Sequence, residues 1–264
     1  MKILHITDPH LVAPHELLHG LSPYQRLVAC IDDILEHHTD AQACVITGDL
    51  THRGELAGYQ ALAQQLQRLP MPVFPLMGNH DIRATFRSVF PQALDDGHGY
   101  VQGVVRLQQH SLVMLDTLSE GESGGRYDAA RYAWLHQTLT RESAANQHIL
   151  LFQHHPFFPV GIPCLDRISL FDPEPMRQML GQFAHIQHLF FGHVHRPVCG
   201  SWRHIPFSTM RGLNHQVPFD LVTQSPVPKS HEPAAYAVAF LSSDGVTVHF
   251  HDFLDRSLYL PARQ

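Results

Sequence analysis

The stretch Ala43-Cys44-Val45-Ile46-Thr47-Gly48-Asp49 decides the fold of this chain. Its first five residues form a short apolar run, which is typical of a strand buried on both faces. Gly48-Asp49 then ends the run in a polar turn and places a carboxylate directly after the strand. The prediction is a buried strand of a parallel sheet, with Asp49 at its carboxyl end.

The segments on either side of this strand alternate between strand and helix. Short apolar runs predict the strands, and apolar residues at helical spacing predict the helices. The predicted elements are strands over residues 3–7 and 72–77 and helices over 23–38, with Ser22 as N-cap, and over 55–69. The resulting β-α-β-α-β order implies parallel strands joined by right-handed crossovers, and therefore an α/β fold.

The second half of the chain adds further strands and helices to this plan. They are antiparallel strands over 101–107 and 111–116, helices over 128–141 and 173–183, strands over 148–153 and 188–191, and a hairpin of 235–241 with 246–251. Segment 211–233 is rich in proline and lacks periodicity. It is predicted to be an insertion, either a cap over the site or a dimerisation segment, in a core formed by residues 1–210 and 234–264.

The composition is that of a folded protein outside the membrane. Hydrophobic residues make up 44% of the 264 residues, which is enough for the core of one large domain. The formal charge of -6 lacks the basic footprint of a protein that binds duplex nucleic acid, so we expect no nucleic-acid partner. The four cysteines show no C-x-x-C spacing, which is typical of reduced thiols in a cytoplasmic protein. No apolar run approaches the roughly 20 residues of a membrane span, so we expect no membrane partner.

Five short polar motifs, most of them directly after an apolar run, supply seven candidate metal ligands. These candidates are Asp8, His10, Asp49, Asn79, His154, His193 and His195. Because the carboxyl ends of parallel strands meet at one edge of a sheet, we expect the side chains to converge. Aspartate, histidine and a single asparagine are the oxygen and nitrogen donors expected of a two-metal hydrolytic centre. Any one motif could be only a turn, but five in this order indicate a ligand set.

The motifs D-x-H, G-D, G-N-H-D, H-H-P and G-H-x-H resemble, in this order, the calcineurin-like metallophosphoesterase family over most of the chain. The stretch GDLTHRGELAGY (48–59), Trp134-Leu135 and HQVP (215–218) make the chain similar to the branch of class III cyclic nucleotide phosphodiesterases and glycerophosphodiesterases. The resemblance implies a four-layer α/β/β/α sandwich with a small C-terminal cap insertion. It also implies a homodimer or a higher homo-oligomer.

The resemblance further implies which residues hold which metal. Asp8, His10 and His195 would hold the first ion. Asn79, His154 and His193 would hold the second, and Asp49 would bridge the two. His154 is preferred to His155 because the histidine of the family lies two residues before the proline. The two ions are expected to be divalent or mixed-valent, and iron, manganese, zinc and cobalt all suit such ligands.

His80 is left without a metal in this assignment and is predicted to be catalytic. It would stabilise the charge that develops on the phosphoryl group and protonate the departing alkoxide. Asp81 is predicted to orient His80, with plain solvation of its carboxylate as the alternative. The implied reaction is in-line attack of a metal-bound hydroxide on a small phosphodiester, either a 3',5'-cyclic nucleotide or a glycerophosphodiester. Asn79 is neutral, so the two ions keep a net positive charge that attracts such a diester.

Four further residues are predicted to contact substrate. They are His52, His155, Asp172 and His215. For Asp172 the alternative is a helix N-cap before residue 173. Arg167 and Arg211 could bind a distal substrate group or lie on the surface.

Other activities on the same site stay open at this point. A phosphonate monoester hydrolase, a phosphomonoesterase and a nuclease would use the same metals. A different class is a scaffold of the same fold that binds protein partners without catalysis, against which the complete ligand set and His80 argue.

Overall fold

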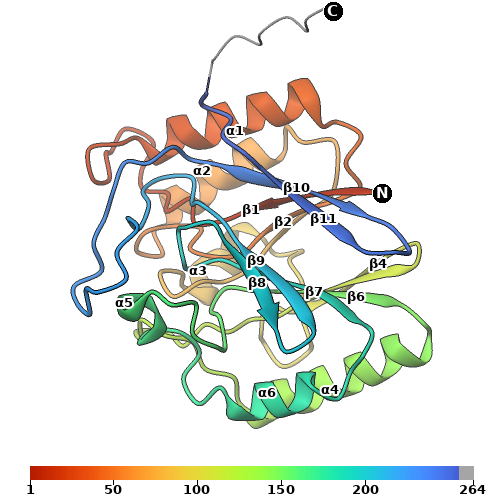
Figure 1. Cartoon of the computed structure of the whole chain (residues 1–264). Coiled ribbons are helices and arrows are strands. Elements are labelled where there is room, and N and C mark those ends of the chain that lie inside the picture. Colours follow the sequence, from red (N-terminus) through yellow and green to blue (C-terminus); the bar gives the residue numbers. More distant parts are fainter. Residues whose placement is uncertain (256–264) are drawn as a thin grey trace, which may run out of the picture.

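Two β-sheets pack face to face between two layers of helices in the computed structural model, which describes residues 1–255 (Figure 1). This arrangement confirms the predicted α/β/β/α sandwich. The end of the predicted core range 234–264, from residue 256 onward, lies outside the described residues.

The first sheet has five strands in the order β11-β10-β1-β2-β3. The strands are β1 (Lys2–Ile6), β2 (Cys44–Ile46), β3 (Val73–Pro75), β10 (Tyr236–Leu241) and β11 (Val246–His251). β1, β2 and β3 run parallel, as predicted, and β10 pairs antiparallel with both β1 and β11. The stretch that opened the sequence argument is therefore a central strand, and Cys44, Val45 and Ile46 are fully buried.

The second sheet has six strands in the order β4-β5-β6-β7-β9-β8. The strands are β4 (Gly103–Leu107), β5 (His110–Met114), β6 (His148–Gln153), β7 (Ile186–Phe191), β8 (Val198–Trp202) and β9 (Ile205–Thr209). β5, β6, β7 and β9 are parallel, and the two edge strands β4 and β8 pair antiparallel with their neighbours. The predicted antiparallel pair is thus β4 with β5.

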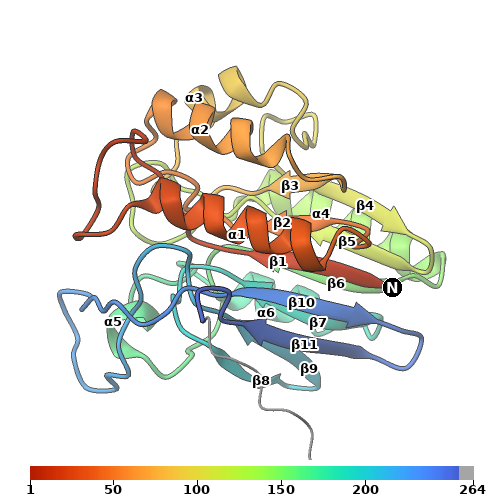
Figure 2. The ribbon, with the colours of Figure 1, turned by 90° about the horizontal axis from the view of Figure 1, so that it is seen from above.

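The described residues form six helices. They are α1 (Pro23–His37), α2 (Leu56–Leu66), α3 (Arg83–Val89), α4 (Ala129–Ala144), α5 (Pro163–Asp166) and α6 (Glu174–Leu180). Figure 1 shows α1 and α2 on one side of the two sheets and α4 and α6 on the other, and Figure 2 shows α1 lying across the first sheet. α3 and α5 were not predicted, because helices this short give a weak periodic signal, and α6, as short as α3, was predicted only as part of the longer range 173–183.

Of the two helix N-caps predicted from the sequence, the one at α1 is confirmed and the one at α6 is not. The Ser22 hydroxyl accepts a hydrogen bond from the Gln25 N–H at 3.3 Å, as predicted for the start of α1. The prediction that Asp172 caps α6 is wrong. Pro173 occupies the cap position without a side-chain bond, and Asp172 adopts a left-handed backbone with φ 51°.

The core has three apolar layers that match the sandwich. The layer between the sheets includes Ile3, Val45, Leu150 and Phe190, all with no exposed surface. A second layer joins α1 and α2 to the first sheet, and a third joins α4 and α6 to the second sheet. Within residues 1–255, none of the helices is long and apolar enough to cross a membrane.

Two histidines are buried in the region between the sheets. His5 of β1 packs edge-on against Phe152 and Phe190, with ring centroids 6.0 and 5.4 Å away. His188 of β7 lies 4.4 Å from the Phe190 ring, and its Nε2 is 2.9 Å from the Ser208 hydroxyl. Burial lowers the pKa of His188 from 6.5 to about 4, so the folded protein keeps this ring neutral.

Replacing His188 by phenylalanine is expected to make stability less sensitive to acid. The unfolded chain takes up a proton on His188 below pH 6.5, whereas the folded protein does so only near pH 4. The unfolding free energy therefore falls across this window, and His188 accounts for at most about 3 kcal/mol of that fall. Urea unfolding of the metal-free protein above and below the window measures it. Equal pH dependence in wild type and variant would contradict the assignment.

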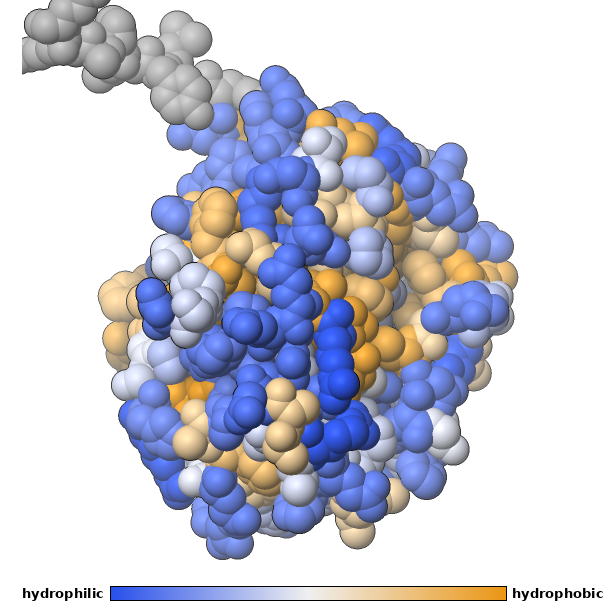
Figure 3. Space-filling model, turned by 90° about the vertical axis from the view of Figure 1, so that its right-hand side faces the viewer, coloured by the Kyte–Doolittle hydropathy of each residue, from blue (hydrophilic) through white to orange (hydrophobic). Residues whose placement is uncertain are grey.

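The parallel strands of both sheets end at the same edge of the sandwich. The loops after β1, β2, β3, β6 and β7 carry the five polar motifs. The opposite end, seen in Figure 3, is a mosaic of hydrophilic and hydrophobic residues. The topology therefore brings the candidate ligands to one place. Open α/β sheets likewise form their binding sites in crevices outside the carboxyl ends of the strands.

Candidate metal centre

The structure brings the seven predicted ligands together at this edge. Asp8 and His10 follow β1, Asp49 follows β2, and Asn79 follows β3, all from the first sheet. The second sheet contributes His154 after β6, and His193 and His195 after β7. Six of the seven residues are at most 5% exposed, and Asn79 is half-buried. Buried carboxylates and imidazoles in one cluster need a compensating charge, which a metal ion supplies.

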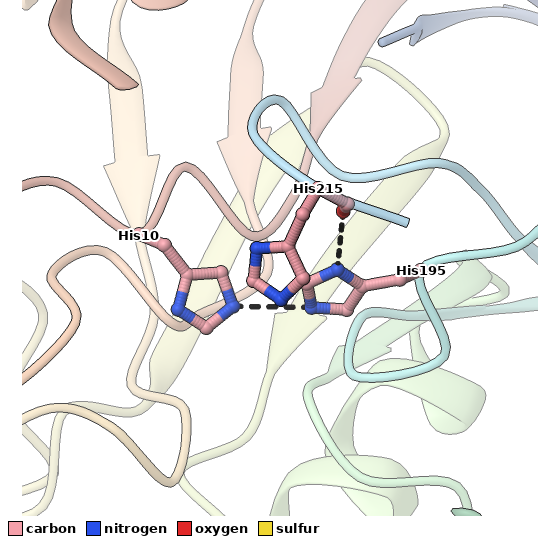
Figure 4. A group of neighbouring side chains, drawn as sticks. All are labelled: His10, His195 and His215. Carbon is pink, nitrogen blue, oxygen red and sulfur yellow. Dashed lines mark hydrogen bonds between the residues drawn. The ribbon is translucent and has the colours of Figure 1, made fainter. Parts of the chain in front are cut away.

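The first group of ligands gathers around His195, and Figure 4 shows this residue with His10 and His215. Its Nε2 lies 3.2 Å from Asp8 Oδ1 and 3.1 Å from His10 Nε2. Its Nδ1–H donates to the backbone oxygen of His215 at 2.7 Å. That bond fixes the proton on Nδ1 and leaves the Nε2 lone pair facing Asp8 and His10. This donor set fits a divalent ion, since metal-ligating histidines use their second nitrogen in this way.

The second group gathers around the side-chain oxygen of Asn79. His154 Nε2 lies 3.2 Å from this oxygen, and His193 Nδ1 lies 3.1 Å from it. His154 Nδ1–H donates to the Thr47 carbonyl at 2.6 Å, so its Nε2 is directed at the group. The geometry thus agrees with His154 as a ligand, although His155 lies close enough to His154 and His193 to belong to the same group.

Asp49 lies between the two groups. Its Oδ2 is 3.4 Å from His10 Nε2 of the first group, and its Oδ1 is 3.5 Å from His154 Nε2 of the second. One oxygen faces each group, which is the arrangement of a carboxylate shared by two ions. The residues present therefore fit a pair of metal ions.

The carboxylates also control the protonation of this cluster. Burial works to lower the pKa of His154, but the nearby Asp49 and Asp8 outweigh it and raise that pKa to about 9. Burial and the charge of His154 lower the pKa of His193 to about 3. Without a cation the cluster therefore holds a proton on His154 to balance its carboxylates, and metal binding displaces that proton.

The backbone of the ligand loops is held in an unusual conformation. Of the ten non-glycine residues with positive φ within residues 1–255, five are predicted ligands: Asp8, His10, Asp49, His193 and His195. L-residues rarely adopt this conformation, and such strain gathers at functional sites. Gly48 has φ +91°, and a Cβ there would lie 2.6 Å from His154 Nδ1. The glycine before Asp49 is therefore required for the close approach of the two groups.

Asp81 does not orient His80 in the structure. Its carboxylate accepts the backbone N–H groups of Leu50, Thr51 and Gly78 at 2.9–3.1 Å and the Tyr59 hydroxyl at 2.9 Å. Asp81 thus ties the loop after β2 to the loop after β3, and burial with the nearby Asp49 raises its pKa to about 7. The alternative of surface solvation is also wrong, because its exposure is 2%.

His80 is held by other groups. Its Nδ1 lies 2.8 Å from the backbone oxygen of His52, and its own backbone N–H donates to Asp49 Oδ1 at 2.9 Å. The rings of His80 and His52 stack with centroids 4.9 Å apart. His80 is therefore fixed beside the shared carboxylate while its Nε2 stays available.

A cavity of about 230 Å³ opens on the cluster. It is lined by the candidate ligands His10, Asp49, Asn79, His193 and His195, by His52, His80 and His215, and by Leu165, Ile168, Val217, Val227 and Lys229. Of the residues predicted to contact substrate, His52 and His215 therefore face the cavity.

His155 and Asp172 are not among the residues that line it. His155 is fully buried and its Nδ1 lies 2.8 Å from the Thr117 hydroxyl, while Asp172 is exposed beside α6. Arg211 forms an ion pair with Asp252 at 2.8 Å, and Arg167 is exposed and does not line the cavity.

Lys229 is the cavity residue that the sequence prediction missed most clearly. It lies in segment 211–233, which also contributes Val217 and Val227 to the wall. Lys229 is one of two lysines in the chain, and its rarity is the only signal that could have singled it out. Its contact with the cavity depends on tertiary placement, which an aperiodic segment does not encode locally.

Comparison with known sequences agrees with this architecture. Residues 1–197 match the calcineurin-like phosphoesterase family. The chain is 40% identical to a probable cyclic nucleotide phosphodiesterase of Rhodopseudomonas palustris, over 96% of this chain and 93% of the relative. It is 30% identical to the 3',5'-cyclic adenosine monophosphate phosphodiesterase CpdA of Escherichia coli, over 76% and 72%. It is 25% identical to a probable glycerophosphodiester phosphodiesterase GpdQ of Arcobacter nitrofigilis, over 94% and 92%.

A solved structure shares the fold. A dimetal phosphatase from Danio rerio superposes with a TM-score of 0.73 at 15% identity, covering 96% of each chain. The sandwich, the order of the motifs and the sequence match over residues 1–197 agree with one another. The chain therefore belongs to the calcineurin-like phosphoesterase family.

Proposed function

We propose that the chain is a two-metal phosphodiesterase that hydrolyses a 3',5'-cyclic nucleotide. The observation that carries the proposal is the cavity over the ligand cluster. Its floor holds five of the seven candidate ligands and His80, and its wall is apolar with one lysine. The relatives named cyclic nucleotide phosphodiesterases support the same substrate class.

The chain's own residues would divide the work as follows. Asp8, His10 and His195 would hold one ion, Asn79, His154 and His193 the other, and Asp49 both. Bound there, the two ions would supply an activated water and neutralise the phosphoryl oxygens. His80 would orient the scissile diester beside Asp49 and, when protonated on Nε2, give its proton to the leaving alkoxide.

The cavity wall favours a flat, partly apolar substrate. Leu165 and Ile168, at and just after α5, line it together with Val217 and Val227 of segment 211–233, and the four belong to one apolar cluster. A nucleobase can pack against such an apolar surface, whereas a glycerol group gains little from it. Asp49 is the one carboxylate among the described lining residues, so the wall does not repel an anionic substrate.

Segment 211–233 serves in this proposal as a cap over the substrate. Besides the lining residues it carries Phe219, Leu221 and Val222, which are 72%, 50% and 81% exposed. Such exposed apolar side chains are typical of a contact surface between subunits. The homo-oligomer stays a prediction. Light scattering of the purified protein tests it.

Turnover on a substrate panel tests the proposal. Metal-reconstituted protein is given a 3',5'-cyclic nucleotide, a glycerophosphodiester, a phosphonate monoester and a simple monoester, and we expect the highest kcat/KM for the cyclic nucleotide. Asn79→Ala should remove most of this activity. Faster turnover of the monoester than of either diester would overturn the assignment, and no turnover with any divalent metal would favour the non-catalytic scaffold.

Replacing Lys229 by methionine is expected to raise KM for the cyclic nucleotide about 5-fold while kcat stays near the wild-type value. Lys229 is exposed at the cavity rim, so its charge attracts the diester without reaching the reacting atoms. The difference from wild type should shrink at high salt. Lys229→Arg is the matched control that keeps the charge. A fall in kcat with unchanged KM would instead place Lys229 in the chemical step.

A further inference from the structure

A chain of hydrogen bonds leads from the space between the sheets to the metal centre. His5 Nε2 lies 2.8 Å from the Thr47 hydroxyl, which donates to the Thr7 hydroxyl at 2.8 Å. Thr7 in turn donates to Asp8 Oδ2 at 2.6 Å. All four side chains are at most 1% exposed, so water does not compete for these bonds.

The carboxylate at the end sets the direction of every bond in the chain. Ionised Asp8 can only accept, so Thr7 must give its single proton to Asp8. Thr47 must then give its proton to Thr7, and His5 must donate to Thr47. Burial lowers the pKa of His5 to about 3, which leaves a neutral ring with its one proton on Nε2. The four groups therefore have one consistent arrangement of protons.

Asp8 uses its two oxygens for different purposes. Oδ2 accepts from Thr7, while Oδ1 lies 3.2 Å from His195 Nε2 and accepts the His193 N–H at 3.3 Å. Thr7 has a second, weaker acceptor in the Thr47 carbonyl at 3.5 Å. If the Thr47 hydroxyl were free to rotate, the Thr7 proton could turn to that carbonyl, and Asp8 would lose the bond that fixes its rotation.

We propose that His5 is a positioning residue for the metal centre, because through Thr47 and Thr7 it holds Asp8 with one oxygen directed at the first group of ligands. The inference rests on the proposed assignment of Asp8, His10 and His195 as ligands of one ion. His5 acts at a distance and touches neither metal nor substrate. This role explains why a neutral polar ring stands at this position, since packing against Phe152 and Phe190 needs only an aromatic ring.

Binding of Co²⁺ alone to His5→Phe tests the inference without using activity. Phenylalanine keeps the ring between Phe152 and Phe190 and removes the donor. Loss of an outer partner of a metal ligand lowers affinity about 10- to 100-fold, and we expect such a loss for the first group only. Titration calorimetry and the absorption spectrum of bound Co²⁺ give the affinity of each site. The Asn79→Ala variant identifies which binding step belongs to the second group.

Three further variants make the test specific. Thr47→Val breaks the chain in its middle and should weaken the same site as His5→Phe. His5→Gln places an amide N–H near the position of Nε2 and should restore most of the affinity. His188→Phe is the matched control, because it also replaces a buried histidine beside Phe190 but lies outside the chain of hydrogen bonds. It should bind Co²⁺ as the wild type does.

The outcomes separate the inference from the function on which it rests. Wild-type protein that binds no Co²⁺ overturns both. If wild type has two tight sites and His5→Phe binds Co²⁺ equally tightly at both, the inference alone is overturned. The same holds if His188→Phe loses as much affinity as His5→Phe, or if His5→Gln does not regain affinity. Selective weakening of the first site, shared by Thr47→Val and reversed by His5→Gln, supports it.

Discussion

Asp49→Ala is expected to lose both metal ions together and to hydrolyse the diester at least about 1,000-fold more slowly. Each oxygen of Asp49 faces one group of ligands, at 3.4 Å from His10 and 3.5 Å from His154. Alanine leaves each group with three ligands and removes half of the carboxylate charge that attracts the ions. Metal content after reconstitution and dialysis, measured together with turnover, tests this.

The matched control for this variant is Asp33→Ala. Asp33 is also a buried carboxylate, 5% exposed, but it accepts from the Tyr236 hydroxyl on the outer side of the first sheet. We expect Asp33→Ala to keep both metals and most of the activity of its folded fraction. An Asp49→Ala protein that retains two ions per chain would contradict the shared carboxylate.

His80→Gln is expected to lower kcat for the cyclic nucleotide about 100- to 1,000-fold, with metal content and KM close to wild type. The ring lines the cavity next to Asp49 and is fixed by the His52 backbone oxygen, but it is not one of the seven candidate ligands. Its loss should therefore affect proton transfer and charge stabilisation more than binding. Steady-state kinetics of the reconstituted variant measure the split between kcat and KM.

A second substrate distinguishes the two roles of His80. A nitrophenyl diester has a leaving group that departs without a proton, so the variant should lose much less activity on it than on the cyclic nucleotide. An equal loss on both substrates would reject the role as general acid. His98→Gln, at an exposed position away from the cavity, is the control for a change of histidine itself.

The parts of the fold that the sequence predicted are those encoded by local pattern. The apolar runs that become β1 and β2 and the helical spacing of α1 need no tertiary information. The convergence of Asp8, Asp49 and His154 was also predictable, because it follows from their places after parallel strands. The ligand set thus depends on topology, which the alternation of elements determines.

The incorrect or missing assignments concern the direction in which a side chain points, which local sequence does not specify. His155 is next to His154, yet the two rings make contacts on different sides, one with Thr117 and one with Asn79. Asp81 follows His80 but turns away from it, since three backbone N–H groups and the Tyr59 hydroxyl need an acceptor there. Lys229 reaches the cavity only because a long aperiodic segment folds back over it.

Each candidate ion draws its ligands from both sheets. The first takes Asp8 and His10 from the first sheet and His195 from the second, and the other takes Asn79 from the first sheet and His154 with His193 from the second. Bound there, the metals would therefore also cross-link the two halves of the sandwich. An ion present at 1,000 times its Kd would add about 4 kcal/mol to the unfolding free energy. Removing the metal with a chelator should therefore lower the stability of the protein as well as abolish its activity.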